Sequence, residues 1–275
     1  MWRISGKRHL FTIGFTLLAG RAFAKPPQPR DYMLDPPKQG LWVHGDLFTA
    51  GAQASVEGRV PVEDESYGHM SWRLSALGSL GYGELAAHFD IRSFLFTFGA
   101  SVGVRDVWRT YDGPRGTDVT RQQRLDEDSA KSFSAEIWPY AEARFRLVVP
   151  LESLWLVTNH VVRYEGTPEN TFDWFNVNVH DGGLLYRGDA VLFYRNKYMG
   201  ALGPYVRYMN LPRGTGRRNE LSFGLMYVVR LGIKNRDDLV SLQVLTRPGD
   251  DEFGFQILRV PLWVMLVYRA SFKIF

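Results

Sequence analysis

Apolar and polar residues alternate along most of the chain after residue 40. The alternation is clearest in eight stretches: 47–60, 70–80, 94–105, 133–147, 175–180, 184–195, 221–231 and 264–274. Several of these stretches run for 11 to 15 residues, whereas an average strand of a soluble protein has about five or six. Because successive side chains of a β-strand point to opposite faces, a period of two predicts long strands with one apolar and one polar face.

Turn-forming segments separate the alternating stretches. The short ones are 81–83, 150–153 and 181–183, and the longer polar ones are 61–69, 109–131, 165–171, 211–219 and 247–252. Short turns combined with longer polar loops are typical of outer-membrane barrels. We therefore predict an all-β fold, a closed antiparallel transmembrane β-barrel of about 12 strands within a range of roughly 10 to 14.

Alternation by itself also fits a periplasmic β-sandwich, which would bury its apolar face instead of exposing it. The chain has 26 arginines but only seven lysines, and the polar faces carry scarcely any lysine. An enclosed lumen favours arginine, because its planar guanidinium group pairs with carboxylates. Aromatic residues also gather near the strand ends, as expected for interfacial girdles: Trp42, Trp108, Trp138, Tyr164, Trp174, Tyr194, Tyr198, Tyr208 and Trp263.

Residues 1–24 have the pattern of a secretory signal peptide. Basic residues open the segment, an apolar run covers 10–20, and Ala22-Phe23-Ala24 forms a small-x-small cleavage site. The run has 11 residues, which is too few for a helix that crosses a bilayer with about 20. Five prolines within 25–40 predict an extended, Pro-rich periplasmic leader, so the barrel is expected at 41–275.

Charge and cysteine content narrow the possible partners and chemistry. The formal net charge of +4 at pH 7 suggests an acidic partner, yet residues 1–24 contribute four basic residues and no acid. The remaining chain holds 29 basic and 29 acidic residues, so no nucleic-acid partner is expected. The absence of cysteine excludes a disulfide framework, a thiolate metal site and a cysteine nucleophile.

The alternating strands, the export signal and the terminal Phe275 give region 41–275 a resemblance to the outer-membrane β-barrel proteins of Gram-negative bacteria. The resemblance implies localisation in the cell outer membrane, contact with its lipid and lipopolysaccharide, and recognition by the barrel assembly machinery. In that family the terminal aromatic residue shares its face with apolar residues. Here this face carries Lys273, Ser271 and Arg269, and the apolar register ends on Ile274.

Charged residues of both signs fall on the predicted polar faces and are expected to line the lumen. Spacing two places them on one side of each strand, and charges cannot face hydrocarbon without a large cost. The predicted lumen-lining residues are Glu57, Arg59, Arg73, Asp90, Arg92, Arg105, Glu136, Glu142, Arg144, Arg146, Arg187, Asp189 and Arg230.

Two histidines stand beside residues that suggest hydrolytic chemistry. His160 follows Asn159, and outer-membrane phospholipases use a Ser-His-Asn set, but no serine lies in a recognisable motif nearby. His180-Asp181 resembles the acid–histidine pairing of outer-membrane proteases, yet it lies at a Gly-rich turn and lacks a second aspartate pair. A lumen or rim position is the expected interpretation of both, and no catalytic residue is predicted.

Three further groups bear on metal or anion binding. His88, Asp90 and Arg92 share one face, which favours a polar network over a metal site because further ligands are missing. The loop residues Asp250, Asp251 and Glu252 are expected to be solvated, with a divalent cation as the alternative. Gly214-x-Gly216 followed by Arg217-Arg218 is no phosphate loop, since no helix pattern follows, but it could contact lipid phosphates. No metal or cofactor is predicted.

These observations support a porin-like channel for small polar solutes as the first functional hypothesis. The alternative is a non-enzymatic barrel within a trans-envelope machine for motility, secretion or polysaccharide export, with other envelope proteins as partners. The proline-rich leader and the long segment 109–131 would reach such partners. An outer-membrane enzyme is the weakest hypothesis, because no catalytic motif is complete.

Overall fold

The computed structural model describes residues 39–49, 51–62, 68–79, 82–93, 95–107, 136–169, 171–173, 175, 178–196, 199–231, 238–247, 255–257 and 260–275. The chain divides into two units, residues 1–35 and 36–275, and all described residues belong to the second. The predicted signal peptide, the leader up to residue 38, the segment 109–131 and the acidic loop 250–252 lie outside the described residues. No helix within the described ranges is long and apolar enough to cross a membrane.

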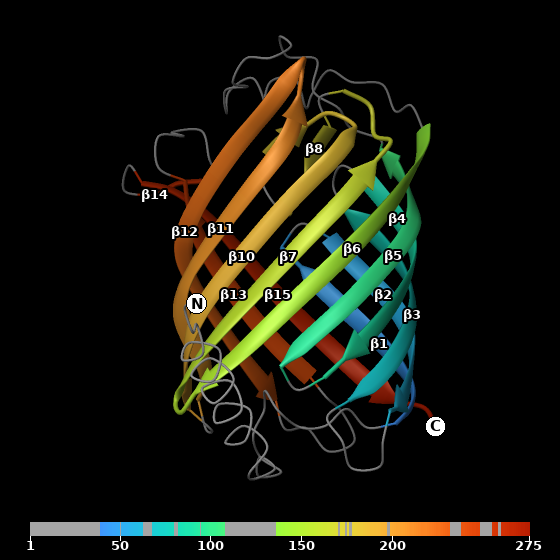
Figure 1. Cartoon of the computed structure of the whole chain (residues 1–275), viewed down its shortest axis with the longest axis vertical. Coiled ribbons are helices and arrows are strands. Elements are labelled where there is room, and N and C mark those ends of the chain that lie inside the picture. The colour runs from blue at the N-terminus through green and yellow to red at the C-terminus, as the bar shows by residue number, and fades with distance from the viewer. Residues whose placement is uncertain are drawn as a thin grey trace, which may run out of the picture. The chain divides into compact units, whose positions relative to one another are not determined.

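Twelve antiparallel strands form one closed ring (Figure 1). They are β1 (Gly40–Phe48), β2 (Gly51–Pro61), β3 (His69–Ser79), β4 (Tyr82–Arg92), β5 (Phe96–Val107), β6 (Glu136–Leu151), β7 (Leu154–Glu165), β10 (Gly183–Asn196), β11 (Gly200–Arg213), β12 (Gly216–Leu231), β13 (Asp238–Thr246) and β15 (Val260–Lys273). Each strand pairs with its neighbour in this order, and β15 closes the ring on β1 with Trp42 opposite Lys273. The predicted fold class and strand number are confirmed.

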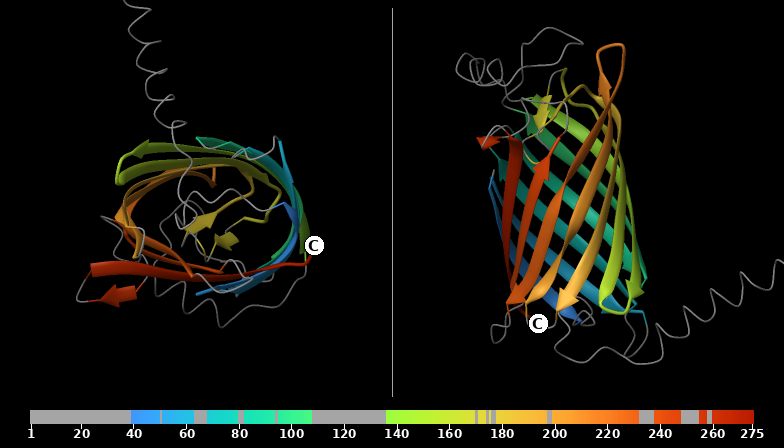
Figure 2. Two further views of the ribbon diagram at one scale, coloured as in Figure 1. Left: turned by 90° about the horizontal axis from the view of Figure 1, so that it is seen from below. Right: turned by 90° about the vertical axis from the view of Figure 1, so that its left-hand side faces the viewer.

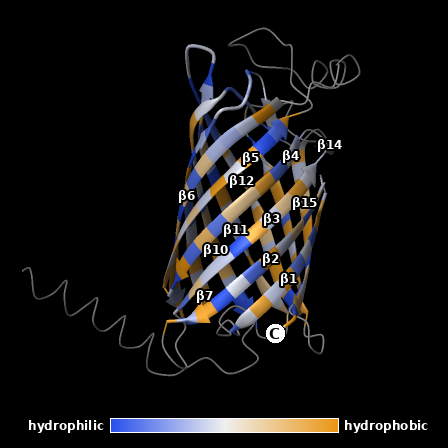
Figure 3. Cartoon of the chain, turned by 90° about the vertical axis from the view of Figure 1, so that its right-hand side faces the viewer, coloured by the Kyte–Doolittle hydropathy of each residue, from blue (hydrophilic) through white to orange (hydrophobic). Residues whose placement is uncertain are grey.

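The two faces of the wall differ sharply in polarity. Large apolar side chains on the outer face are exposed, for example Leu85 at 61%, Val102 at 61% and Leu225 at 54%. Their neighbours on the inner face are polar and buried, such as Ser101 and Ser222. Figure 3 shows the resulting alternation of hydrophobic and hydrophilic residues along each strand. An exterior of this kind is stable only against hydrocarbon, so the ring is a transmembrane barrel.

Connection lengths distinguish the two ends of the barrel. The end that carries the C-terminus (Figure 1) has only the connections 62–68, 93–95, 152–153, 197–199 and 232–237, none longer than seven residues. The opposite end has three two-residue connections and also the longest ones, such as 108–135 and 166–182, which join β5 to β6 and β7 to β10. Because outer-membrane barrels have short periplasmic turns and longer external loops, the C-terminal end is periplasmic and the opposite end is the outer mouth.

A small hairpin lies within the outer mouth rather than in the wall (Figure 2). It consists of β8 (Thr171–Asp173) and β9 (Asn178–His180), which form a separate two-stranded sheet. The ring of Phe175 packs edge-on against Phe48, with 5.2 Å between ring centroids. Our expectation of a wall strand at 175–180 was wrong, because three paired residues are too few to cross a bilayer, which takes about nine to eleven.

The strand-end aromatics only partly form the expected girdles. Tyr164 and Tyr194 face outward and are 59% and 56% exposed. Trp42 and Trp263 are buried on the inner face instead, because they share the parity of the polar residues on their strands. The Arg59 guanidinium lies over the Trp42 ring at 4.7 Å, so this indole packs against a lumen cation. Trp108, Trp174 and Tyr198 lie outside the described residues.

The C-terminus continues the closing seam beyond β15. The Ile274 N–H donates to the Leu41 carbonyl at 2.8 Å, and the Leu41 N–H donates to the Phe275 carbonyl at 3.2 Å. The Phe275 side chain is 79% exposed. The strand β14 (Phe255–Ile257) pairs only with β15, beside the ring.

Candidate functional site

The structure places the predicted lumen charges on the inner face of the wall. Strand parity sets them opposite the exposed apolar residues. For Glu136 only the backbone is described, paired with Val107. The inward-facing side chains are Glu57, Arg59, Arg73, Asp90, Arg92, Arg105, Glu142, Arg144, Arg146, Arg187, Asp189 and Arg230.

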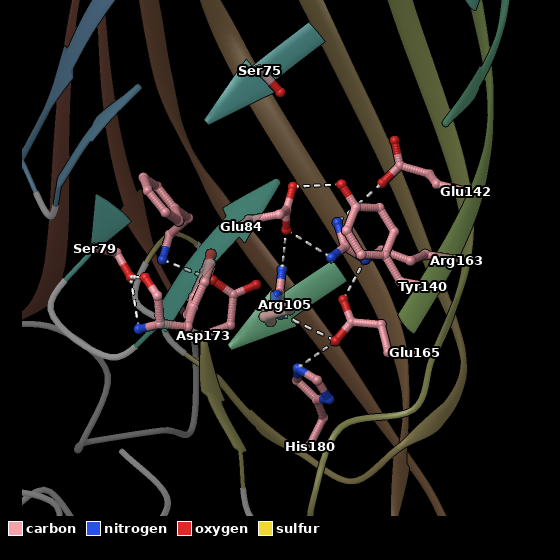
Figure 4. Close-up of polar contacts among 12 residues, drawn as sticks. Ser75, Ser79, Glu84, Arg105, Tyr140, Glu142, Arg163, Glu165, Asp173 and His180 are labelled. Carbon is pink, nitrogen blue, oxygen red and sulfur yellow. Dashed lines mark hydrogen bonds and ion pairs between the residues drawn. The ribbon is translucent and has the colours of Figure 1, made fainter. Parts of the chain in front are cut away.

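A network of ion pairs crosses the inner wall beside the outer mouth (Figure 4). Arg105 donates to Glu84 at 3.0 Å and to Glu165 at 3.1 Å. Arg163 donates to the same Glu84 oxygen at 2.9 Å and also pairs with Glu165. The Tyr140 hydroxyl donates to the second Glu84 oxygen at 2.6 Å. Five side chains from β4, β5, β6 and β7 are thereby held in one cluster.

Burial and aromatic stacking stiffen this network. Arg105 and Glu165 are each only 3% exposed. The Arg163 guanidinium lies 3.6 Å from the Tyr140 ring centroid, and that of Arg105 lies 4.0 Å from the Tyr82 centroid. A buried cation is stable only when it is paired and hydrogen-bonded, and both conditions are met here.

Glycines on β5 give the neighbouring side chains room to cross it. A Cβ on Gly99 would lie 2.1 Å from an Asp90 oxygen and 3.1 Å from Arg144 Nε. Across this gap, Arg144 of β6 donates to Asp90 of β4 at 3.1 Å. A Cβ on Gly103 would likewise lie 2.7 Å from the Tyr140 ring. The small residues of β5 therefore permit β6 to be tied directly to β4.

His88 belongs to a hydrogen-bonded chain rather than to a metal site. One ring nitrogen lies 2.8 Å from the Ser75 hydroxyl and the other 2.8 Å from the Ser101 hydroxyl. Both nitrogens are therefore engaged, and the nearby Asp90 pairs with Arg144. No group of three or more potential metal ligands occurs among the described residues.

A second cluster centres on Asp189 of β10. Arg207 Nε donates to one carboxylate oxygen at 2.8 Å, and the Tyr205 hydroxyl donates to the same oxygen at 2.5 Å. Arg187 lies 3.1 Å from the other oxygen, and the Asn159 amide donates to it at 3.4 Å. The carboxylate is fully surrounded by donors, so it balances two of the lumen arginines.

The closing seam carries its own ion pairs. Arg269 of β15 donates twice to Asp46 of β1, at 2.6 and 2.9 Å. His44 bridges the Ser271 hydroxyl and the Glu57 carboxylate, each at 2.8 Å. These bonds supplement the backbone ladder where the first and last strands of the ring meet.

Two inward-facing arginines differ from the rest of the lumen set. Arg92 and Arg146 are exposed to solvent although they point into the barrel. Within the described chain neither forms an ion pair or a hydrogen bond with a carboxylate. Arg92 interacts electrostatically with Arg146, Arg230 and Arg59, and also with the Glu57 carboxylate. The inner face therefore carries two exposed arginines that form no ion pair with a described carboxylate.

The candidate hydrolytic pairs are not assembled. His160 faces the membrane, where it contacts the Tyr186 hydroxyl at 2.8 Å, whereas Asn159 points inward. Residues on opposite faces of a strand cannot act on one substrate atom. His180 lies 3.9 Å from Glu165, while Asp181 pairs with Arg213 instead. The expected lumen or rim position of His160 was wrong because its strand parity points outward.

Sequence reasoning missed several members of these clusters. Arg163 and Glu165 continue the alternation of β7, and their parity alone would have placed them in the lumen. Glu84 lies near the start of β4, outside the eight alternating stretches, and Tyr140 shares the inward parity of Glu142 and Arg144 within the stretch 133–147. The ion-pair partner of each charged residue depends on the register between neighbouring strands. An alternation with a period of two does not reveal that register.

No protein-family model and no curated protein matches the chain. Several solved structures are similar to the chain at very low identity. LpxR from Salmonella typhimurium is 9% identical, with a TM-score of 0.41 over 85% of this chain and 99% of that one. The KdgM porin is 9% identical, with a TM-score of 0.38 over 86% and 99%. The translocator domain of the autotransporter NalP from Neisseria meningitidis is 13% identical, with a TM-score of 0.36 over 96% and 94%.

The closed ring and the polarity of its faces decide the class of protein. The exterior is apolar, the interior holds paired and exposed charges, and the first and last strands of the ring pair antiparallel from Trp42–Lys273 to Phe48–Val267. Only a closed barrel satisfies every backbone hydrogen bond of a sheet inside a bilayer. The chain is a twelve-stranded β-barrel of the outer membrane.

Proposed function

We propose that the barrel is a porin-like channel for small polar solutes. The observation that carries this proposal is the solvent exposure of Arg92 and Arg146 on the inner face. In the proposed channel, a solute of a size and polarity similar to water reaches the same side chains that solvent reaches. Lumen-facing side chains of this kind tune the selectivity of outer-membrane barrels.

The charges favour anions over cations. Arg92 and Arg146 have no carboxylate partner among the described residues, whereas Asp90 and Asp189 each face at least one arginine. Rings of unpaired arginine raise the local concentration of anions in a pore. The proposed channel therefore conducts anions in preference to cations.

The outer mouth limits the size of the solute. The hairpin β8–β9 lies there, and its Asn178 amide contacts Met209 of β11 at 3.4 Å. The buried network of Arg105, Arg163 and Glu165 occupies the adjacent wall. These groups narrow the entrance, so the proposal is restricted to small solutes.

The same mouth favours a second candidate function, a non-enzymatic barrel within a trans-envelope machine. A hairpin seated in the mouth and a rigid buried network suit a scaffold as well as a constriction. Other envelope proteins are the proposed partners in that case, whereas the barrel assembly machinery is a proposed partner under either function. We assign no catalytic role in either case, since Asn159 and His160 face opposite sides.

Conductance in planar bilayers tests the proposal and separates the two candidates. The purified, folded barrel should produce discrete current steps in potassium chloride. A barrel that migrates as a folded species but gives no current steps at any applied voltage contradicts the channel and supports the scaffold.

A further inference from the structure

Polar side chains gather on the membrane-facing side of β11 and β12, close to the outer mouth. They are Tyr208 and Asn210 of β11 and Arg217 and Asn219 of β12, all of outward parity. Asn219 lies opposite Asn210, and Arg217 is the second residue after the turn 214–215. They interrupt an outward face that is otherwise apolar along β12, from Leu221 to Leu225.

The hydrogen bonds within this cluster fix the direction of every amide. Arginine can only donate, and Arg217 Nε donates to Asn210 Oδ1. The Asn210 amide nitrogen must therefore lie on the other side, where it donates to Asn219 Oδ1 at 2.6 Å. The Tyr208 hydroxyl donates to the same Asn219 oxygen at 2.8 Å.

This assignment leaves two donor groups of the cluster without a partner among the described residues. Both amide oxygens already accept hydrogen bonds, whereas the Asn219 Nδ2 group and Arg217 Nη1 have no partner among the described residues. Arg217 Nη2 donates to the Leu184 carbonyl at 2.6 Å, which holds the guanidinium in place. Within the described chain no carboxylate pairs with Arg217. A cation beside a free amide donor favours an anionic ligand, which accepts hydrogen bonds from both.

The position of the cluster identifies the source of that anion. Below Arg217 the outward residues of β12 are Leu221, Phe223 and Leu225, which are 44%, 39% and 54% exposed. The donors therefore lie where the apolar band of the barrel ends at its outer mouth. In an outer membrane this level holds the phosphates of lipopolysaccharide. We propose that Arg217 and Asn219 bind a phosphate of lipid A at a specific site on the barrel wall.

Aromatic rings continue from the cluster along the outer face and would contact the acyl chains of the bound lipid. Tyr208 and Tyr186 have ring centroids 6.1 Å apart, and Tyr186 and His160 are stacked at 6.3 Å. His160 is in turn stacked on Phe145 at 6.3 Å. Rings of this kind offer flat apolar contacts beside a polar anchor.

Native mass spectrometry of the detergent-purified barrel tests the proposal. The probes are lipid A with two phosphates, the same lipid without phosphates, and inorganic phosphate. Arg217→Ala removes the cation. Asn219→Asp keeps the oxygen that accepts from Tyr208 and Asn210, but replaces the free donor with a negative oxygen. The matched control is Arg218→Ala, which removes the same charge from the next residue, on the inner face, where Glu220 keeps Arg247 as a partner at 2.9 Å.

The proposal predicts that the wild-type barrel retains one diphosphorylated lipid A. Arg217→Ala and Asn219→Asp should each weaken retention about tenfold, the effect of one lost charge-assisted hydrogen bond. Arg218→Ala should bind like the wild type. The proposal is overturned if Asn219→Asp binds lipid A as tightly as the wild type, or if Arg217→Ala and Arg218→Ala lose the same affinity. Equal retention of the lipid without phosphates would overturn it as well. Tight binding of inorganic phosphate alone would also overturn it, since the site would then serve a soluble anion.

Discussion

The Asp90–Arg144 ion pair depends on a residue that has no side chain. It crosses β5 above Gly99, where a Cβ would lie 2.1 Å from the Asp90 oxygen. Any larger residue displaces one partner of the pair or distorts the wall. The specific geometry of the lumen is therefore set as much by small residues as by charged ones.

Gly99→Val tests this dependence. We expect the folded barrel to lose about 1–3 kcal/mol of stability, the usual cost of forcing extra methyl groups into a packed site. Gly45→Ala is the control, because a Cβ there meets no atom within 4 Å. Urea unfolding in detergent micelles measures both variants, and equal midpoints for Gly99→Val and the wild type would count against the crossing.

The face of the wall on which each charged residue lies could be predicted from the sequence, but its ion-pair partner could not. Period two placed Glu142 and Arg144 on the inner face because side-chain direction is a local property of a strand. The bond from Arg105 to Glu165 joins residues 60 positions apart. Such contacts depend on the register of three strands, which no local pattern specifies.

Each wall strand presents one face to lipid and one to the lumen, and β12 shows this over 16 residues. Leu225 points outward at 54% exposure, and the next residue, Met226, lies opposite Gln243 on the inner face. The side chains of two consecutive residues therefore lie in different environments, one in the hydrocarbon of the membrane and the other in the polar interior of the barrel.

Substitution with arginine at these two neighbours should have opposite consequences. Leu225→Arg places a cation against lipid, which costs about 2–4 kcal/mol near the bilayer midplane, so assembly should fall. Met226→Arg places the same cation in the lumen and should assemble close to the wild-type level. The yield of heat-modifiable, folded barrel measures both, and similar yields would show that the facing assignment of β12 is wrong.

Long strands were easier to predict than short ones. Eleven or more alternating residues leave little ambiguity, whereas the alternation at 175–180 proved to belong to the mouth hairpin. The burial of Asn178 and His180 arises from their contacts within the barrel, and these contacts are tertiary. A short alternating segment cannot reveal whether it pairs with the wall.

At the scale of the whole molecule, closure of β1 on β15 removes every free edge from the ring. The ring exposes apolar side chains on all sides, which water would not tolerate. Stability and location are therefore linked, and the folded state requires a membrane or a detergent.

Cell fractionation tests this link. The mature chain should sediment with the outer membrane and migrate faster on a gel when the sample is not heated, because the closed ring resists detergent unfolding. Recovery of the chain in the soluble periplasmic fraction would refute the membrane assignment.

The proposed channel is tested most directly by its reversal potential in a planar bilayer with a potassium chloride gradient. We predict discrete current steps with a preference for chloride in the wild type. Arg92→Ala combined with Arg146→Ala removes the two solvated arginines without breaking a described ion pair, so the preference should shift toward potassium while the barrel stays folded. No current from folded wild-type barrels, or an unchanged reversal potential in the folded double variant, would contradict a channel governed by these residues.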